Sequence, residues 1–408
     1  MATMKFYHIT PTRFATTLLL FFSMAISAQT PDSLSQRPAL QQVQLDIAPN
    51  YVFQTRDFLK GDNLKHRKID QSLSFHLKYA FQFARDSYFG RLYPHAYQGI
   101  GVSYNTFFNS TEVGNPIAVY VFQGSRIVGI SRQLSLDYEW NFGASFGWKP
   151  YDSDKNVFNN MVGSKVNAYL NFGLYLNWHM DGCWNLRAGI DATHYSNGNT
   201  HYPNAGVNLI GARIGIAHTF DATYLHSAKY QPTDVVAAEK PYWCLDVAAY
   251  GATRSKGIVS ENYIVPGSFG VCGLTINPMY NLNKYVKAGV SLDGQYDESA
   301  NLDQHIAGKN EEDNSKLMFF RQPFSERFSV GMSLRTEFTM PIFSINFGIG
   351  HSVIYKGEDH NGFYQVLILK TFITRNIFLH TGYRLNKFRD PKNLMIGFGY
   401  RFTGRHKK

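Results

Sequence analysis

The chain has 408 residues, of which 44% are hydrophobic, 15% aromatic and only 17% charged, below the roughly 25% that is usual in soluble domains. Beyond the N-terminus, no stretch approaches the roughly 20 consecutive apolar residues of a membrane-spanning helix, which excludes a helical membrane protein. The net charge of +10 comes from Lys and Arg residues scattered along the chain rather than gathered in one patch, which argues against nucleic-acid binding.

The first segment, residues 1–28, has the three parts of a signal peptide. Lys5 and Arg13 precede a short apolar stretch at 15–26, and the small residue Ala28 offers a cleavage site before Gln29. The alternative is a buried N-terminal helix. We expect a secreted protein whose mature chain begins near Gln29 and is inserted in the Gram-negative outer membrane.

The mature chain alternates apolar and polar residues with a period of two in about sixteen runs. Many of these runs have 10–15 residues, closer to the roughly 9–11 of a tilted membrane strand than to the 5–6 of a soluble sheet. One run, 134–148, assigns Trp140 and Trp148 to the same apolar face. The pattern predicts an all-β fold, an antiparallel up-and-down outer-membrane β-barrel. The clearest runs are 73–83, 134–148, 168–178, 328–334, 343–349 and 394–402.

The connectors between these runs tend to alternate in length, as periplasmic turns and extracellular loops do. Short turns are expected at 179–183, 338–342 and 373–376, and long loops at 55–70, 149–163, 295–326 and 352–362. A longer connector at 221–241 separates two halves of about eight strands, 29–220 and 242–408. Two tandem barrels and one large barrel are both compatible with this division.

A polar group interrupts the apolar face of two strands near the middle of the chain. Parity places His194 and Ser196 on the face of Ile190, and Asn208 on the face of Ile210. Polar side chains directed at lipid are costly, so three at one strand end suggest a use. Residues two apart share a face, and residues directly opposed across a hairpin have Cβ atoms about 5 Å apart. His194 as base, Ser196 as nucleophile and Asn208 as the group that holds the imidazole make a catalytic triad. The alternative is a polar hairpin tip solvated by lipid headgroups.

These residues resemble those of the PagL-like lipid A deacylases, which are outer-membrane serine esterases. The family pattern His-x-Ser-Asn, then Pro-Asn and Gly, is matched by His194, Ser196, Asn197, Pro203, Asn204 and Gly206. The resemblance implies an eight-stranded barrel with its site on the outer wall, near the extracellular leaflet. It makes Asn197 and Asn204 candidates for the oxyanion hole. The alternative is that these two Asn residues only form the turn. The family has Glu where this chain has Asn208, which accepts a hydrogen bond without offering a charge.

The sequence therefore predicts an outer-membrane serine esterase that removes ester-linked acyl chains from lipid A, with lipopolysaccharide as its partner. The alternative is a non-catalytic barrel, a pore or a surface-binding protein, which a wide charged lumen would favour. Inside the barrel, we expect Asp191 to pair with Arg213. The three cysteines have no metal or disulfide spacing, and Asp359-His360 has no third ligand at a suitable spacing. We expect no metal and no cofactor.

Overall fold

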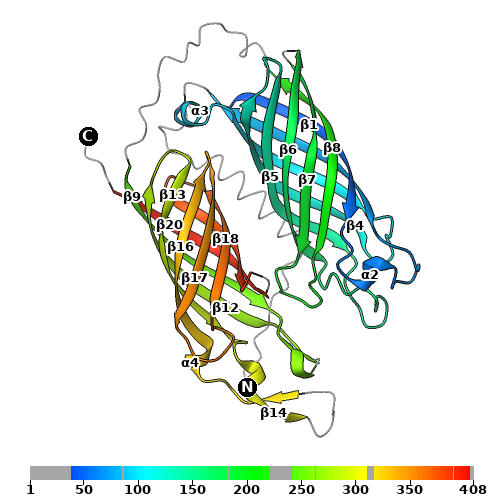
Figure 1. Ribbon diagram of the computed structural model, residues 1–408, viewed down its shortest axis with the longest axis vertical. Helices are drawn as coiled ribbons and strands as arrows, with labels where there is room; N and C mark the ends of the chain where they lie inside the picture. The colour runs from blue at the N-terminus through cyan, green and yellow to red at the C-terminus, as the bar shows by residue number, and fades with distance from the viewer. Residues whose placement is uncertain are drawn as a thin grey trace.

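A computed structural model describes residues 38–84, 87–181, 183–220, 241–261, 263–309, 317–388 and 390–404. Two closed antiparallel barrels of eight strands each account for most of these residues (Figure 1). The predicted β-barrel fold is thus confirmed, and the chain forms two barrels rather than one. The predicted signal peptide, and the linker 221–241 except Pro241, lie outside the described residues.

The first barrel follows the chain without crossovers. Each strand pairs with the next, and β8 closes the barrel on β1. Its strands are β1 (Pro38–Val52), β2 (Gln71–Phe83), β3 (Ala96–Thr106), β4 (Gly114–Gly129), β5 (Leu134–Trp148), β6 (Val166–Asp181), β7 (Trp184–Ser196) and β8 (Val207–Phe220). Short helices α2 (Asp57–Lys60) and α3 (Tyr88–Leu92) lie in two connectors.

The second barrel closes in the same way, through pairing of β20 with β9. Its strands are β9 (Trp243–Arg254), β12 (Phe269–Asn281), β13 (Val286–Asp297), β16 (Phe328–Thr339), β17 (Phe343–Ile354), β18 (Phe363–Phe372), β19 (Ile377–Asn386) and β20 (Asp390–Thr403). Its loops carry α4 (Phe324–Arg327), the 3-10 turns η3 (Val259–Glu261) and η4 (Leu302–His305), and two ribbons, β10 (Gly257–Ile258) with β11 (Tyr263–Ile264) and β14 (Ile306–Lys309) with β15 (Leu317–Phe319).

Within the part of the chain that the structure covers, no helix has the length and apolar character needed to cross a membrane.

The strand pleat separates apolar from polar side chains across each barrel wall. On β2, for example, Phe75 and Leu77 are 45% and 54% exposed on the outside, while His76 and Lys78 are buried inside. The same alternation recurs along the other strands, so the outer walls form apolar surfaces and the lumens are polar. This arrangement is the one that a lipid environment requires of a β-barrel.

The lumen of the first barrel is filled by paired charges. Glu139 is fully buried between Lys78, at 2.5 Å, and Arg187, at 2.9 Å. Arg213 pairs with Asp191, which confirms the predicted ion pair and the strand register behind it. These side chains are all buried, so they close the barrel interior at their level.

The second barrel repeats this arrangement with different residues. Glu337 is fully buried between Lys370 and Arg401, each at 2.5 Å. Asp246 also pairs with both cations, at 2.6 Å to Lys370 and 2.7 Å to Arg401. Each barrel therefore neutralises a buried Glu with one Lys and one Arg.

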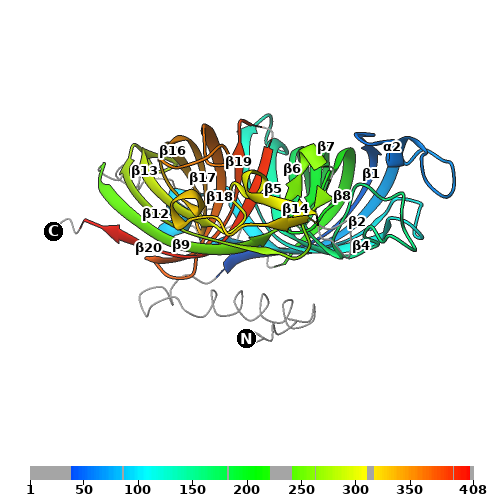
Figure 2. The same cartoon turned by 90° about the horizontal axis from the view of Figure 1, so that it is seen from below.

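The two barrels lie side by side with their longer loops at the same end, where α2, α4 and β14 are found (Figures 1 and 2). Their contact covers part of the outer wall of β5. The Trp140 ring packs edge-on against Phe343 with centroids 5.0 Å apart, and its Nε1 donates to the Met340 sulfur. Trp140 is only 7% exposed, although its parity assigns it to the outer face. This stretch of apolar wall therefore contacts protein rather than lipid.

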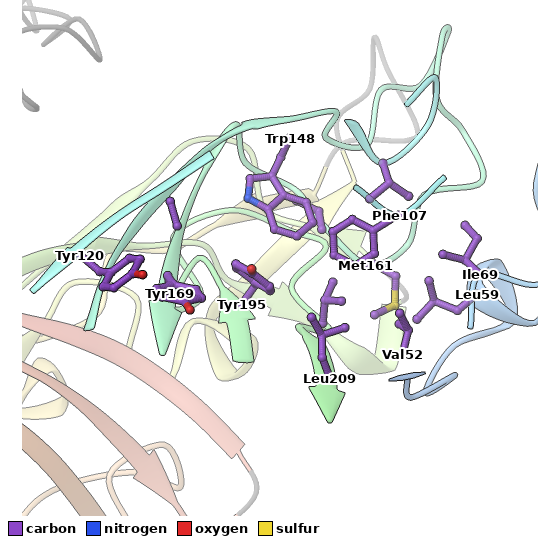
Figure 3. Packing of buried hydrophobic residues seen from close by; sticks show 14 of the residues in the cluster. Val52, Leu59, Ile69, Phe107, Tyr120, Trp148, Met161, Tyr169, Tyr195 and Leu209 are labelled. Atoms are coloured by element: carbon purple, nitrogen blue, oxygen red, sulfur yellow. The ribbon is translucent and has the colours of Figure 1, made fainter. Parts of the chain in front are cut away.

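Trp148 departs from the predicted alternation. Parity assigned it to the outer face with Trp140, but it is buried in the apolar cluster that fills the loop end of the first barrel (Figure 3). Gly147 has a φ of +93°, a left-handed backbone conformation that reverses the direction of the next side chain. The prediction for Trp148 was wrong because a period-two pattern in the sequence does not show where one residue has a left-handed backbone conformation.

Candidate functional site

The site lies on the β7–β8 hairpin, where two inward side chains fix the direction of their neighbours. Tyr195 is buried and packs against Trp148 and Tyr169, with ring centroids 5.0 and 5.4 Å away (Figure 3). Leu209 on β8 is buried in the same cluster. Because strand residues alternate, anchoring Tyr195 inward directs His194 and Ser196 outward.

His194 and Asn208 face each other directly across this hairpin. The His194 Nδ1 lies 2.6 Å from the Asn208 Oδ1. An amide oxygen only accepts hydrogen bonds, so Nδ1 carries the hydrogen and donates it. In the neutral ring this leaves the lone pair on Nε2, the nitrogen that a general base uses.

Ser196 stands two residues beyond His194 on the same outer face and is half-buried. No hydrogen bond joins its hydroxyl to the His194 ring in the described structure, and in enzymes this bond often tightens only once substrate is bound. The hairpin thus places a hydroxyl, an imidazole and an amide hydrogen-bonded to that imidazole along one strip of outer wall. Such a strip has the composition needed for acyl transfer.

Gly206 has a role at the site that the sequence pattern alone did not assign. Its φ of +73° is a left-handed conformation, and a Cβ built there would lie 2.9 Å from His194 Cε1. The backbone can therefore pass directly beside the imidazole only because no side chain is present. The match of Gly206 to a family motif was the only sequence signal for this close approach.

The two Asn residues proposed for the oxyanion hole hold the connecting loop together. Asn204 Oδ1 accepts the backbone N–H of Asn197 at 3.0 Å, and Asn197 Nδ2 donates to the His201 carbonyl at 2.8 Å. Asn197 is buried, whereas Asn204 is half-buried. The Asn204 Oδ1 accepts the loop hydrogen bond, so the Nδ2 of the same side chain remains as a donor for a ligand.

A neighbouring loop, residues 149–165, supports this hairpin and was not expected to contribute. The Ala205 N–H donates to the Met161 carbonyl at 3.1 Å, and Val162 forms an isolated β-bridge with Asn204. A Cβ on Gly163 would lie 2.4 Å from the Tyr202 backbone, so the two loops are in close contact. No local pattern in the sequence indicates a contact between segments so far apart.

The wall around the site is apolar and exposed. Tyr51 on β1 is paired with Ile210 on β8, and both are nearly half exposed. Beside them Phe53, 43% exposed, donates its N–H to the Asn208 carbonyl at 3.0 Å. A hydrocarbon chain lying along this wall would contact these side chains and bring an attached ester group to the polar strip.

The other polar candidates lie elsewhere. Asp191, the acid nearest to His194 along the strand, is inside the barrel with Arg213. Asp359 pairs with Lys256 and Lys392 in a loop of the second barrel. In the ranges that the structure covers, no three His, Cys, Asp or Glu side chains are placed to hold a metal ion.

Comparison with known proteins gives one family match in each barrel. Residues 73–217 match the family model described as "Lipid A 3-O-deacylase (PagL)". Residues 243–405 match the model "Acyloxyacyl hydrolase, C-terminal domain". Together the two matches cover most of both barrels, and the first contains the whole His194–Asn208 hairpin.

Among solved structures, the chain is similar to the outer membrane enzyme PagL, with 14% identity, a TM-score of 0.27, and coverage of 42% of this chain and 97% of that one. It is also similar to Neisserial surface protein A, with 8% identity, a TM-score of 0.29, and coverage of 44% and 96%. The N-terminal β-barrel domain of Pseudomonas aeruginosa OprF matches at 9% identity and a TM-score of 0.26, over 44% of this chain and 97% of that one. No curated protein matches the chain.

Proposed function

The chain belongs to the PagL family of lipid A deacylases, and from this premise we propose that it is a serine esterase that removes ester-linked acyl chains from lipid A. It is an integral outer-membrane protein, with apolar outer walls on two closed barrels. The observation that carries the proposal is the 2.6 Å contact between His194 Nδ1 and Asn208 Oδ1, on the lipid-facing wall and two residues from Ser196.

The proposed reaction begins with attack of the Ser196 Oγ on the carbonyl carbon of the ester. His194 Nε2 accepts the hydroxyl proton as the new C–O bond forms, and Asn208 holds the ring in the tautomer that makes this possible. When the tetrahedral intermediate collapses, the ester C–O bond breaks and His194 returns the proton to the leaving alkoxide. The product at this stage is an acyl group on Ser196 and a free hydroxyl on the lipid.

Water then completes the cycle. His194 takes a proton from a water molecule, whose oxygen attacks the acyl carbon on Ser196. The bond between that carbon and the Ser196 Oγ then breaks, His194 returns the proton to Oγ, and the fatty acid is released. In both steps negative charge develops on the carbonyl oxygen, and the Asn204 Nδ2 is the donor proposed to stabilise it, with Asn197 keeping Asn204 in place. Because Asn208 has no charge, the imidazolium formed in each step is stabilised less than it would be by a carboxylate.

The position of the site fits a lipid substrate. The hairpin lies at the end of the barrel that carries the long loops, which face the outside of the cell in barrels of this type. Acyl chains of an outer-leaflet lipid lie beside this wall, with their ester groups near the membrane surface. A site in the lumen could not be reached by such a substrate, whereas the outer wall can.

The alternative of a pore receives no support from the lumens. Lys78, Glu139 and Arg187 fill the first barrel, and Glu337 lies between Lys370 and Arg401 in the second. All six side chains are buried. A continuous water-filled channel would expose such charges instead of pairing them.

The test is mass spectrometry of lipid A from cells that contain the wild-type chain, the Ser196→Ala chain or neither, at matched outer-membrane levels. In wild-type cells, lipid A should carry fewer acyl chains and a fatty acid should be released. Lipid A from Ser196→Ala cells should match that from cells without the protein. Deacylation by Ser196→Ala at the wild-type level would assign the hydrolysis to another group. Unchanged lipid A in wild-type cells, together with ion conductance by the purified protein, would favour the pore.

A further inference from the structure

The tip of the site hairpin contacts the second barrel. The Ser255 N–H donates to the Asn199 carbonyl at 2.9 Å, and the Ser255 Oγ donates to the Thr200 carbonyl at 2.8 Å. Ser255 directly follows β9 and is buried. Two consecutive carbonyls of the hairpin tip are thus held by one residue of the other barrel.

Asn199 itself contacts a second strand of the other barrel, β20. Its side-chain Nδ2 points at the carbonyls of Pro391 and Lys392, at 3.4 and 3.3 Å, where β20 begins. Asn199 is 1% exposed and has a φ of +67°, a left-handed conformation that Asn adopts more readily than most residues. Since β20 pairs with β9, the tip is hydrogen-bonded to residues at the ends of the two strands that close the second barrel.

The backbone at Gly198 also lies against the second barrel. A Cβ at Gly198 would lie 2.5 Å from side-chain atoms of Leu394, so the backbone itself rests against β20. The φ of +64° at Gly198 is also left-handed. A side chain here would strain the backbone and would require either the Leu394 side chain or the hairpin tip to shift.

The hairpin tip is connected to the proposed oxyanion donor by short hydrogen bonds. Thr200 Oγ donates to the Asn197 carbonyl at 3.0 Å, and the Asn197 N–H donates to Asn204 Oδ1 at 3.0 Å. Two residues further on, Gly206 passes beside the His194 ring. The conformation imposed at Asn199 and Thr200 therefore determines where Asn204 and Gly206 lie relative to the imidazole.

We propose that Ser255 and Asn199 are positioning residues for the deacylation, through which the second barrel orders the loop that carries Asn204. The inference rests on the proposed function and gives the second barrel a part in it. A ten-residue loop with glycines at 198 and 206 has many conformations in isolation. Donors that stabilise an oxyanion act only when they are already in place, so ordering the loop should raise kcat.

The experiment uses the full-length protein in detergent micelles with purified lipid A, and follows fatty-acid release. Ser255→Ala removes the hydroxyl bond to Thr200, Ser255→Thr keeps the hydroxyl, and Asn199→Gly keeps the left-handed backbone without the amide. Ser131→Ala is the matched control, since Ser131 Oγ accepts backbone N–H groups in a turn at the opposite end of the first barrel. Heat-modified migration on gels verifies that each variant is folded.

We expect kcat to fall about fivefold in Ser255→Ala and about tenfold in Asn199→Gly, as the loss of one or two hydrogen bonds implies, with KM within about twofold of wild type. Ser255→Thr should recover most of the activity, and Ser131→Ala should behave as wild type. Hydrogen exchange of the peptide 199–206 should accelerate in Ser255→Ala and Asn199→Gly only.

An active wild type whose Ser255→Ala and Asn199→Gly variants keep its kcat would overturn this inference and leave the proposed function intact. Equal losses in Ser255→Thr and Ser255→Ala would overturn the role of the hydroxyl. A wild type that releases no fatty acid would overturn the proposed function and the positioning role with it. The three failures are therefore distinguishable.

Discussion

The two barrels contain similar sets of paired charges in their lumens. In the first, Glu139 lies between Lys78 and Arg187, and in the second, Glu337 lies between Lys370 and Arg401. These charges compensate one another inside a narrow barrel, where an unpaired ion would be costly. The similarity shows that the paired charges belong to the fold and are not evidence of a binding site.

The outer walls differ. The last hairpin of the first barrel places His194, Ser196 and Asn208 outward, whereas β19 in the second places Thr381, Tyr383 and Leu385 outward. An imidazole or a carboxamide on a lipid-facing wall is costlier than the hydroxyls of Thr and Tyr. Comparing the barrels thus separates what any such barrel needs from what the proposed reaction needs, and it agrees with our proposal of chemistry in the first barrel and support from the second.

The strongest test of this division substitutes one outward hydroxyl in each barrel. Ser196→Ala should reduce fatty-acid release by at least about 10³-fold, because the nucleophile is lost. Thr381→Ala, on the penultimate strand of the second barrel, should leave the rate within about twofold. Both rates are measured on the full-length protein at equal concentrations. Comparable losses in the two variants would end the assignment of chemistry to the first barrel.

The shared lumen arrangement predicts matching losses of stability. Glu139→Ala and Glu337→Ala each remove one buried carboxylate. Asp46 stays beside Lys78 and Asp246 beside Lys370, but one positive charge in each lumen loses its compensation, which should destabilise the affected barrel by about 3–5 kcal/mol. Urea unfolding followed by hydrogen exchange assigns the loss to one barrel or the other, since β5 and β16 give separate peptides. A loss in only one of the two variants would show that the barrels are not equivalent inside.

A smaller effect is expected at the amide that orients the imidazole. Asn208→Leu removes the acceptor for His194 Nδ1 and should lower kcat about 10- to 100-fold, as the loss of a hydrogen bond to a group that becomes charged implies. Asn208→Asp and Asn208→Glu should keep or raise kcat, because a carboxylate also stabilises the imidazolium. The measurement is kcat of the three variants from steady-state kinetics. Equal kcat in Asn208→Leu and wild type would exclude Asn208 from the site.

The smallest effect concerns pH and the loops of the second barrel. Burial alone would raise the pKa of Asp359, but Lys392 and Lys256 outweigh it and hold that pKa well below its ordinary value of 3.8. A depressed pKa means that the stabilisation is present above about pH 4 and is lost as the pH falls through the folded-state value. Asp359→Asn should therefore loosen the loop at pH 7 by about 1–3 kcal/mol.

The measurement is hydrogen exchange of residues 355–361 in the wild type and in Asp359→Asn at pH 7 and at lower pH. The difference between the two proteins should shrink as the wild-type carboxylate is protonated. A difference that grows on acidification would mean that Asp359 is not held in its charged form by the two lysines. The first barrel should show no change in either protein.

Much of the fold and of the hairpin geometry followed from local patterns. Period-two alternation is imposed by the pleat of each strand, so it indicated which side of the wall each residue would occupy. It therefore placed His194 and Ser196 on one face with Asn208 across from them, as the structure has them, and it aligned Asp191 with Arg213. The family motif added the roles proposed for these residues.

The remaining features depend on contacts that a local pattern does not contain. Gly147 turns Trp148 inward by one left-handed residue, and Trp140 is covered by Phe343 from the other barrel. The number of barrels depends on whether β8 pairs with β1 or continues to β9, since all three strands alternate in the same way. Likewise, Ser255 has no sequence feature that connects it with Asn199.

The ion pairs inside the barrels include one at each closing strand pair, which has a consequence for assembly. Arg213 on β8 approaches Asp46 on β1 at 3.8 Å, and Arg401 on β20 binds Asp246 on β9 through two nitrogens at 2.7 Å. These strands are far apart in the chain, and their edges stay unpaired until closure. A slip of one residue during closure would turn the arginine toward lipid, away from its aspartate. Each closing pair thus favours a single register, in which the nascent barrel can seal only when its first and last strands are correctly aligned.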